Sequence, residues 1–479
     1  MMTGRFRVWA FVVSGLLLAG CGSSPGGGGT GGTGGGASSS GGTGGSPAGS
    51  GGATGGQPAA TGGAAGMAIG TGGGTGGRTA SGGSAGGARG GAAGQGSGGA
   101  AGKGSGGAAG GGGRPATGGA GGTGGSLAAT GGAGGRAALP SFLLGADITD
   151  QEPAPSAAQD NLLSQMKSHG FNAIRLRTFV DPKAADGYDK TNGYDDIAHT
   201  ATFGKKVKDA GFALLVDFHM SDNWADPGKQ CVPVAWQGYT SITALAGAVH
   251  DYVKASITTL IAGGARPDMV QIGNETTPGM LLHICDSGGQ RSSDAPLQGA
   301  ATSAGWPNLG MLLKAGVAGV REVDPTILVS FHIDRGNAYS TTKSWLDNAI
   351  KQGATPDAFG ESCYQQYQGD TSSVTNTVNG WKSTFTQLVA AYPSIKFFAA
   401  EYGPLEREIN DVVFALPAAQ GMGTFDWEPT TQGDWNAKQP TDPATVTTHA
   451  LFQRSGNTYT ALPDLSLYDQ MKADYAGRL

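Results

Sequence analysis

Two apolar stretches of the chain end abruptly in a glutamate: Val270-Gln-Ile-Gly-Asn-Glu275 and Phe397-Phe-Ala-Ala-Glu401. A short apolar run followed at once by a polar side chain is typical of a strand that is buried on both faces and ends at a site. Two carboxyl groups that meet could cleave a glycosidic bond, because one can protonate the leaving oxygen while the other attacks the sugar or activates water. Either glutamate alone could instead cap a helix or pair with a cation, so the hypothesis depends on the elements that bring them together.

Strand and helix patterns alternate along the chain after residue 141. We predict strands over residues 142–147, 172–177, 213–219, 270–275, 327–332, 358–364, 397–401 and 422–427, and helices over residues 156–169, 197–210, 241–262, 309–323, 343–351, 374–391, 411–419 and 467–475. Eight such units predict a parallel sheet that closes into a (β/α)8 TIM barrel, an α/β fold in which all strands end on one face. The rival fold, a doubly wound nucleotide-binding sheet, requires a glycine-rich turn that residues 149–155 lack.

The N-terminal residues carry the marks of an export signal. Basic residues precede an apolar run over residues 8–18 and the sequence Leu18-Ala-Gly-Cys21, which resembles a bacterial lipobox. We predict a lipoprotein signal peptide over residues 1–20 and a lipid on Cys21. The protein would then be an outer-membrane lipoprotein exposed at the cell surface, or be secreted. An ordinary secretion signal with an incidental cysteine is the alternative.

Composition separates the rest of the chain into two parts. Glycine supplies 90 of the 479 residues, and most of these lie ahead of residue 137 among Ala, Ser and Thr. Such a stretch buries too little apolar surface to fold, so we predict a disordered linker over residues 21–137 and a catalytic domain over residues 138–479. The net charge of −5, with no Lys/Arg cluster beside aromatic residues, argues against nucleic acid as a partner. We expect a monomer.

Polar and aromatic side chains gather at the predicted strand ends: Asp147, Arg175, Arg177, Asp217, His219, Asn274, His332, Tyr364, Trp427 and Glu428. Aromatic rings offer flat apolar faces to sugars. Arg175 could only pair with Asp147 or Asp217, or it could favour the anion of a catalytic glutamate, and both interpretations stay open. The two histidines could be core residues or sugar contacts.

Longer motifs surround these residues: Leu214-Leu-Val-Asp-Phe-His-Met-Ser-Asp-Asn-Trp-Ala-Asp-Pro-Gly-Lys-Gln230, Pro267-Asp-Met-Val-Gln-Ile-Gly-Asn-Glu275, Gly279-Met-Leu281, Ala399-Ala-Glu-Tyr402 and Gly423-Thr-Phe-Asp-Trp-Glu-Pro429. In these motifs the chain from residue 142 to 429 resembles the glycoside hydrolase family 53 endo-β-1,4-galactanases. The resemblance implies a retaining, endo-acting hydrolase of β-1,4-galactan in arabinogalactan that requires no cofactor. Glu275 would be the acid/base and Glu401 the nucleophile.

The resemblance also implies a set of substrate-binding residues: Asp147, Arg175, His219, Trp224, Asn274, His332, Tyr364 and Trp427. Asn274 would bind the hydroxyl beside the reacting carbon. The chain departs from the family in Ser362-Cys-Tyr-Gln-Gln366, where members often have Ser-Tyr-Tyr-Pro, and in His283-Ile-Cys285. These departures concern the finer subsites and not the two glutamates. Two alternatives to the galactanase function are a retaining β-glycanase acting on mannan, glucan or xylan and a non-catalytic glycan-binding surface protein.

The remaining cysteines and loop carboxylates allow two structural predictions. Export would place the chain in an oxidising compartment, where a disulfide between Cys231 and Cys285 could join two loops. Cys363 resembles a buried small apolar residue. Some bacterial relatives carry a loop calcium, and three acidic residues could ligate one here: Asp222, Asp226 and Asp286. Their spacing forms no clear ligand set, so we expect surface carboxylates and no metal site.

Overall fold

The computed structural model describes residues 139–368, 372–430 and 450–479. The predicted signal peptide (residues 1–20), the lipidation site Cys21 and the predicted linker (residues 21–137) lie outside the described residues. Among the helices that are described, none is both long enough and apolar enough to cross a membrane.

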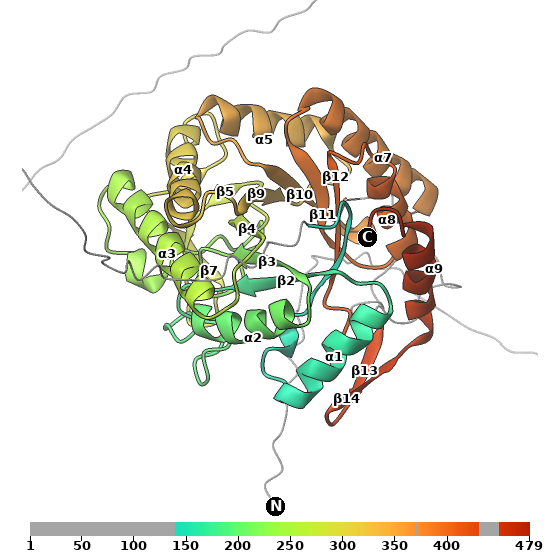
Figure 1. Ribbon diagram of the computed structural model, residues 1–479. Helices are drawn as coiled ribbons and strands as arrows, with labels where there is room; N and C mark the ends of the chain where they lie inside the picture. Colours follow the sequence, from blue (N-terminus) through green and yellow to red (C-terminus); the bar gives the residue numbers. More distant parts are fainter. Residues whose placement is uncertain (1–138, 369–371, 431–449) are drawn as a thin grey trace, which may run out of the picture. The chain divides into compact units, whose positions relative to one another are not determined.

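Eight parallel strands close into a barrel (Figure 1). They are β1 (Leu143–Asp147), β2 (Ala173–Thr178), β3 (Ala213–Phe218), β4 (Met269–Ile272), β9 (Leu328–Ile333), β10 (Ala358–Cys363), β11 (Lys396–Tyr402) and β12 (Gly421–Trp427). Each pairs with the barrel strands before and after it in the sequence, and β12 pairs with β1 to close the ring. The (β/α)8 barrel predicted from the sequence is confirmed.

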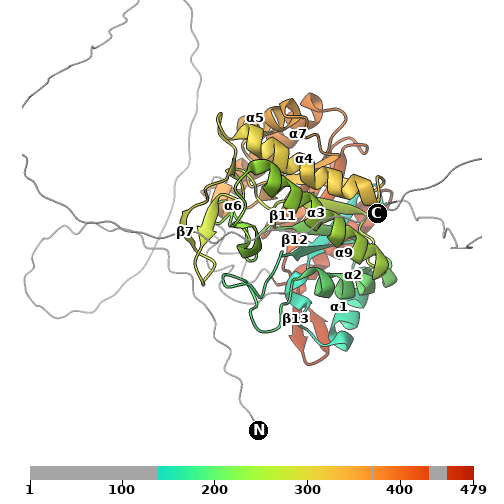
Figure 2. The same ribbon diagram turned by 90° about the vertical axis from the view of Figure 1, so that its left-hand side faces the viewer.

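Helices surround the barrel, as the two views in Figures 1 and 2 show. They are α1 (Ser156–Ser168), α2 (Ile197–Asp209), α3 (Ile242–Ala262), α4 (Trp306–Val323), α5 (Tyr339–Lys351), α7 (Val374–Ala391), α8 (Glu406–Phe414) and α9 (Ser466–Asp474). Apolar side chains fill the space between strands and helices: Val270 and Ile272 of β4 belong to one buried cluster with Leu312 of α4. Removing this surface from water holds the two layers together.

Several predicted element bounds differ from the structure. The helices predicted to begin at residues 309 and 343 begin at Trp306 and Tyr339. The helix expected over residues 411–419 is α8 at Glu406–Phe414, because the chain turns into a helix directly after β11 and Pro417 has no N–H for a helix interior. The strand expected to end at Glu275 is β4, which ends at Ile272. Gly273 (φ 79°) and Glu275 (φ 45°) are both left-handed, which ends the strand and lifts the glutamate onto a loop.

The inside of the barrel changes from apolar to polar along the strands. Ala173, Leu215 and Met269 belong to an apolar cluster near the amino ends of β2, β3 and β4. Two residues further along β2 and β4, on the same face, lie Arg175 and Gln271, both buried. The apolar layer therefore closes the bottom of the barrel, and the polar layer above it opens toward the strand ends.

Short additional elements elaborate the loops. The segment after β4 contains two hairpins, β5 (Gly279–Met280) with β8 (Gly299–Ala300) and β6 (His283–Cys285) with β7 (Arg291–Asp294). The short helix α6 (Gln365–Gln368) follows β10, and a hairpin of β13 (Phe452–Ser455) and β14 (Thr458–Ala461) packs beside α1. Most of this elaboration lies after β4, on the segment that follows Glu275.

Candidate active site

Arg175 lies at the centre of a buried network at the carboxyl ends of the strands, with 1% of its surface exposed. Its Nη1 donates to Asp147 Oδ2 at 2.8 Å, and its Nη2 contacts Asp217 Oδ2 at 2.7 Å and Asn274 Oδ1 at 2.9 Å. Nη2 also lies 2.9 Å from Glu401 Oε1. Both interpretations of Arg175 therefore apply, because it pairs with the barrel aspartates and with a predicted catalytic glutamate.

Glu401 is held inside β11 by two neighbours. Besides Arg175, Tyr364 donates its hydroxyl to Glu401 Oε2 at 3.2 Å. Burial raises the pKa of the Glu401 carboxyl to about 7, while the positive charge of Arg175 and the Tyr364 hydrogen bond act in the opposite direction. A cation in contact with a carboxyl favours its ionised form. This is the environment that a carboxylate nucleophile requires.

Glu275 has different surroundings. Ser362 Oγ donates to its Oε1 at 2.6 Å, and its backbone N–H donates to His332 Nδ1 at 3.4 Å. Burial raises the pKa of Glu275 well above its usual range, and the negative charges of Glu401 and Asp334 raise it further. Of the two carboxyls, Glu275 is therefore the one that keeps its proton.

The loop after β3 holds the backbone on both sides of Glu275. Gln230 Nε2 donates to Asn274 O at 2.7 Å, and it lies 3.4 Å from Glu275 O and 3.2 Å from Asp226 O. In return, Asn274 Nδ2 donates to Ala225 O at 2.8 Å. A left-handed glutamate is thus fixed by side-chain amides rather than by a strand ladder.

His332 links this loop to β10. Its Nδ1 lies 2.9 Å from Asn274 Oδ1 and 3.2 Å from Gln271 Nε2, and its Nε2 lies 2.9 Å from Ser362 Oγ. Burial, together with the charge of Arg175, holds the pKa of His332 well below its usual range. The ring is therefore neutral and acts through hydrogen bonds, not through charge.

His219 orients the loop after β3. Its Nε2 lies 3.0 Å from Asp217 Oδ2, and its Nδ1 accepts from Ala225 N at 3.1 Å. The ring also packs edge-on against Phe179 and Trp224, with centroids 5.1 and 5.9 Å away. Both ring nitrogens are thus engaged with protein groups, which makes His219 part of the scaffold of the site.

Two half-buried tryptophans, Trp224 and Trp427, form a second group beside the network. Their ring centroids are 6.4 Å apart, and the guanidinium of Arg177 lies 4.1 Å from the Trp224 ring. Arg177 also pairs with Glu428 at 2.8 Å and with Asp195 at 3.2 Å. Trp427 is the last residue of β12. An aromatic wall thus lies at the same strand ends as the carboxyls.

Comparison with known proteins identifies the family. The profile of glycosyl hydrolase family 53 matches residues 149–401. The chain belongs to this family. An uncharacterized protein of Niallia circulans is 27% identical over 359 residues, 67% of this chain and 93% of that protein. The endo-β-1,4-galactanase of Bacillus subtilis is 26% identical over 320 residues, 60% of this chain and 70% of that enzyme.

Solved structures of family 53 have the same fold. The GH53 catalytic domain of Ignisphaera aggregans superposes with a TM-score of 0.52 at 26% identity, covering 69% of this chain and 96% of that domain. A fungal β-1,4-galactanase structure superposes with a TM-score of 0.51 at 22% identity over 68% of this chain and 94% of its own. The second likeness shows the fold alone.

In this family 53 member the structure gathers most of the predicted site residues into one connected set of contacts: Asp147, Arg175, His219, Asn274, Glu275, His332, Tyr364 and Glu401. Trp224 and Trp427 form the adjoining aromatic group. The polar residues that contact this set and were not predicted as site residues include Gln230, Gln271 and Ser362. Gln271 alone had a local signal, because it is the single polar residue of an apolar strand.

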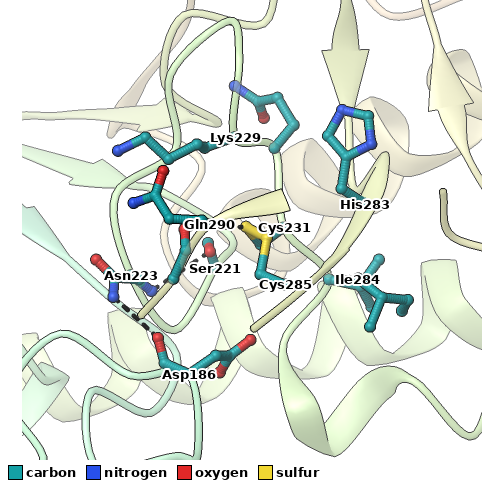
Figure 3. The surroundings of a disulfide bond; sticks show 12 residues. Asp186, Ser221, Asn223, Lys229, Cys231, His283, Ile284, Cys285 and Gln290 are labelled. Atoms are coloured by element: carbon teal, nitrogen blue, oxygen red, sulfur yellow. Dashed lines mark hydrogen bonds between the residues drawn. A yellow bond between two sulfur atoms is a disulfide. The ribbon is translucent and has the colours of Figure 1, made fainter. Parts of the chain in front are cut away.

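The structure joins Cys231 and Cys285 in a disulfide, which ties the loop after β3 to β6 (Figure 3). Cys231 directly follows Gln230, the residue that binds the backbone of Asn274 and Glu275. Cys363 is a buried free thiol. The disulfide thus braces the loop that holds Glu275.

The three carboxylates weighed as calcium ligands bind parts of the protein. Asp222 is buried, so the expectation of a surface carboxylate is wrong there, and it accepts from the backbone N–H of Asp181 and Val234. Asp226 accepts from Gly228 N, and Asp286 from Gly288 N and Gln290 N, within their own turns. Among the described residues, no three His, Cys, Asp or Glu side chains are grouped so that they could hold a metal ion.

Proposed function

We propose that this family 53 member is a retaining endo-β-1,4-galactanase in which Glu275 is the general acid/base and Glu401 the nucleophile. The observation that supports this assignment is the contrast between the two carboxyls. Arg175 contacts Glu401, whereas the charges that act on Glu275 are those of other carboxylates. Environments that separate the pKa values of two carboxyls in this way assign the acid and the base.

The chemistry follows from these protonation states. Glu401 attacks the anomeric carbon while the proton of Glu275 passes to the glycosidic oxygen, so the leaving sugar departs as an alcohol. In the second step Glu275, now ionised, takes a proton from water, and the water oxygen displaces Glu401 from the sugar. Asn274, fixed by Arg175 and Gln230, binds the hydroxyl next to the reacting carbon.

The proposed substrate is the β-1,4-galactan of arabinogalactan. Relatives named as arabinogalactan endo-β-1,4-galactanases, such as that of Humicola insolens at 26% identity, support this choice. Trp224 and Trp427 would offer their faces to sugar rings, and Tyr364 and His332 would border the cleaved linkage. We also propose that the chain is exported as a monomer with a lipid on Cys21, at the outer membrane or secreted, on the sequence pattern alone.

Sugar release from a panel of polysaccharides tests the substrate. We expect galactan to be cut internally, giving a rapid fall in viscosity, with retained configuration in the first product seen by NMR. Hydrolysis of mannan, glucan or xylan without galactan would contradict the assignment.

Variants of the two glutamates test the mechanism. Glu401→Ala should abolish turnover, and azide should restore part of it as a small external nucleophile. Glu275→Gln should keep galactan binding and lose hydrolysis. A wild-type protein that binds galactan but hydrolyses none of the polysaccharides would favour the glycan-binding alternative.

A further inference from the structure

Ser362 lies between the two proposed catalytic glutamates. It is fully buried near the end of β10, where its Oγ donates to Glu275 Oε1 at 2.6 Å. The same oxygen lies 2.9 Å from His332 Nε2. In the strand pairing, Ser362 is opposite Glu401 of β11. One hydroxyl therefore contacts the proposed acid/base from the strand next to the proposed nucleophile.

Glu361 and Ser362 are consecutive residues of β10, so their side chains point to opposite faces of the strand. The register shift beside them lies on β11, where Ala400 is the extra residue between Ala399, opposite Glu361, and Glu401, opposite Ser362. The side chain of Glu361 points to the helix layer, where it accepts from Thr342 Oγ1 of α5 at 2.6 Å and from Arg335 N at 3.0 Å. β10 thus places a structural carboxyl on its helix-facing side and, on its other side, the hydroxyl that contacts Glu275.

We propose that Ser362 is the positioning residue for proton transfer by Glu275, an inference that rests on the proposed retaining function. By binding Oε1, the hydroxyl leaves Oε2 to exchange the proton with the glycosidic oxygen. When the C–O bond breaks, this proton moves to the leaving oxygen, and Ser362 donates its hydrogen to the new carboxylate. When water attacks the sugar in the second step, its proton returns to Oε2 and Glu401 departs.

His332 keeps the hydroxyl in place for both steps. Its Nδ1 accepts from the backbone N–H of Glu275, and its Nε2 donates to Ser362 Oγ. A hydroxyl has one hydrogen to donate and two lone pairs to accept with, so Ser362 can bind Glu275 and His332 together. The chain from His332 through Ser362 to Glu275 therefore restricts rotation of the acid/base carboxyl.

Ser362→Ala tests this role through the leaving group. We expect kcat/KM to fall about 10- to 100-fold on galactan and on a phenyl β-galactobioside, because the lost hydrogen bond is to a carboxyl that becomes charged as its proton leaves. A dinitrophenyl β-galactobioside should lose less than about threefold, since its leaving group departs without a proton. The basic limb of kcat/KM should move to higher pH, because the Ser362 hydrogen bond lowers the pKa of Glu275.

Two further variants keep the test decisive. Ser330→Ala removes another buried serine hydroxyl, on β9, which donates to Val270 O at 3.0 Å. This variant should have the wild-type kcat/KM on all three substrates and the wild-type pH profile. Ser362→Thr keeps a hydroxyl and should retain most of the activity. Melting temperatures check that each variant is folded.

Three results for folded Ser362→Ala would overturn the inference: equal losses on the two aryl substrates, an unshifted basic limb, or full activity on galactan. The first would indicate general damage to the site. A wild-type protein without galactanase activity would overturn the proposed function instead, so the two failures are distinguishable.

Discussion

The two proposed catalytic glutamates are held in opposite ways. Glu401 is part of a barrel strand, and its carboxylate is fixed by the buried cation of Arg175. Glu275 lies three residues beyond its strand in a left-handed conformation, and neutral groups hold it: the Ser362 hydroxyl, the His332 ring and the Gln230 amide. One glutamate is held by charge within the strand ladder, the other by hydrogen bonds on a loop.

This difference suits the two tasks. A nucleophile must stay ionised and aimed at one carbon, which a rigid strand and a fixed positive charge provide. An acid/base must gain and lose a proton in each cycle, so a cation in contact with it would hold it in one state. Neutral hydrogen-bonding partners can serve both protonation states, because a hydroxyl can donate or accept.

Arg175→Lys should cause the largest loss, because it disturbs the charge on the Glu401 side. Lysine keeps the positive charge, but it lacks the planar guanidinium with which Arg175 contacts three carboxylates. We expect kcat/KM on galactan to fall about 10²- to 10³-fold, as when a group that fixes developing charge is lost. Steady-state kinetics measure this loss.

The neighbouring arginine on β2 is a matched control for this change. Arg177→Lys makes the same substitution two residues on, where the side chain pairs with Glu428 and Asp195. Arg177 is also buried, but its described ion pairs include neither proposed catalytic glutamate, so the loss of kcat/KM should stay below about tenfold. Equal losses in both variants would mean that the buried charge balance as a whole, rather than the contact with Glu401, sets the activity.

Gln230→Ala should lower the activity by a smaller factor, because Gln230 holds the loop that carries Glu275. Its amide binds the carbonyls of Asn274 and Glu275, and losing such bonds should lower kcat about 10- to 30-fold with a smaller change in KM. Gln237→Ala, in the same loop, removes an amide that binds only Val232 O among its described contacts, so kcat should stay near wild type. A change in KM alone would show that the loop binds sugar instead of holding the acid/base.

The sequence predicted the barrel, which is confirmed, because the barrel depends on a local pattern of alternating strands and helices. Carboxylates after apolar runs indicated both glutamates, whose catalytic roles stay predictions. The sequence did not predict how Glu275 is held. Gln230 and Ser362 reach it from the loop after β3 and from β10. Both stand in stretches that carry the family comparison, but nothing along the chain indicates which distant residue they contact. The left-handed backbone at Glu275 also has no sequence signal, since glutamate rarely adopts it.

Tyr364→Phe should have the smallest effect, and the pH profile should reveal it. The Tyr364 hydroxyl donates to Glu401 Oε2, which lowers the pKa of a carboxyl that burial raises to about 7. Without this bond the pKa of Glu401 rises, so the fraction ionised at a given pH falls. The acid limb of kcat/KM should therefore move to higher pH, with less than about tenfold loss on the plateau.

Tyr392→Phe serves as the control for this shift, because its hydroxyl binds Asp347 and Lys343 O in the helix layer. Its profile should match that of the wild type. An acid limb of Tyr364→Phe that stays in place or moves to lower pH would mean that Glu401 does not set that limb. In that case another group of the network would set the acid limb. Asp217, which contacts Arg175, would be the first group to test.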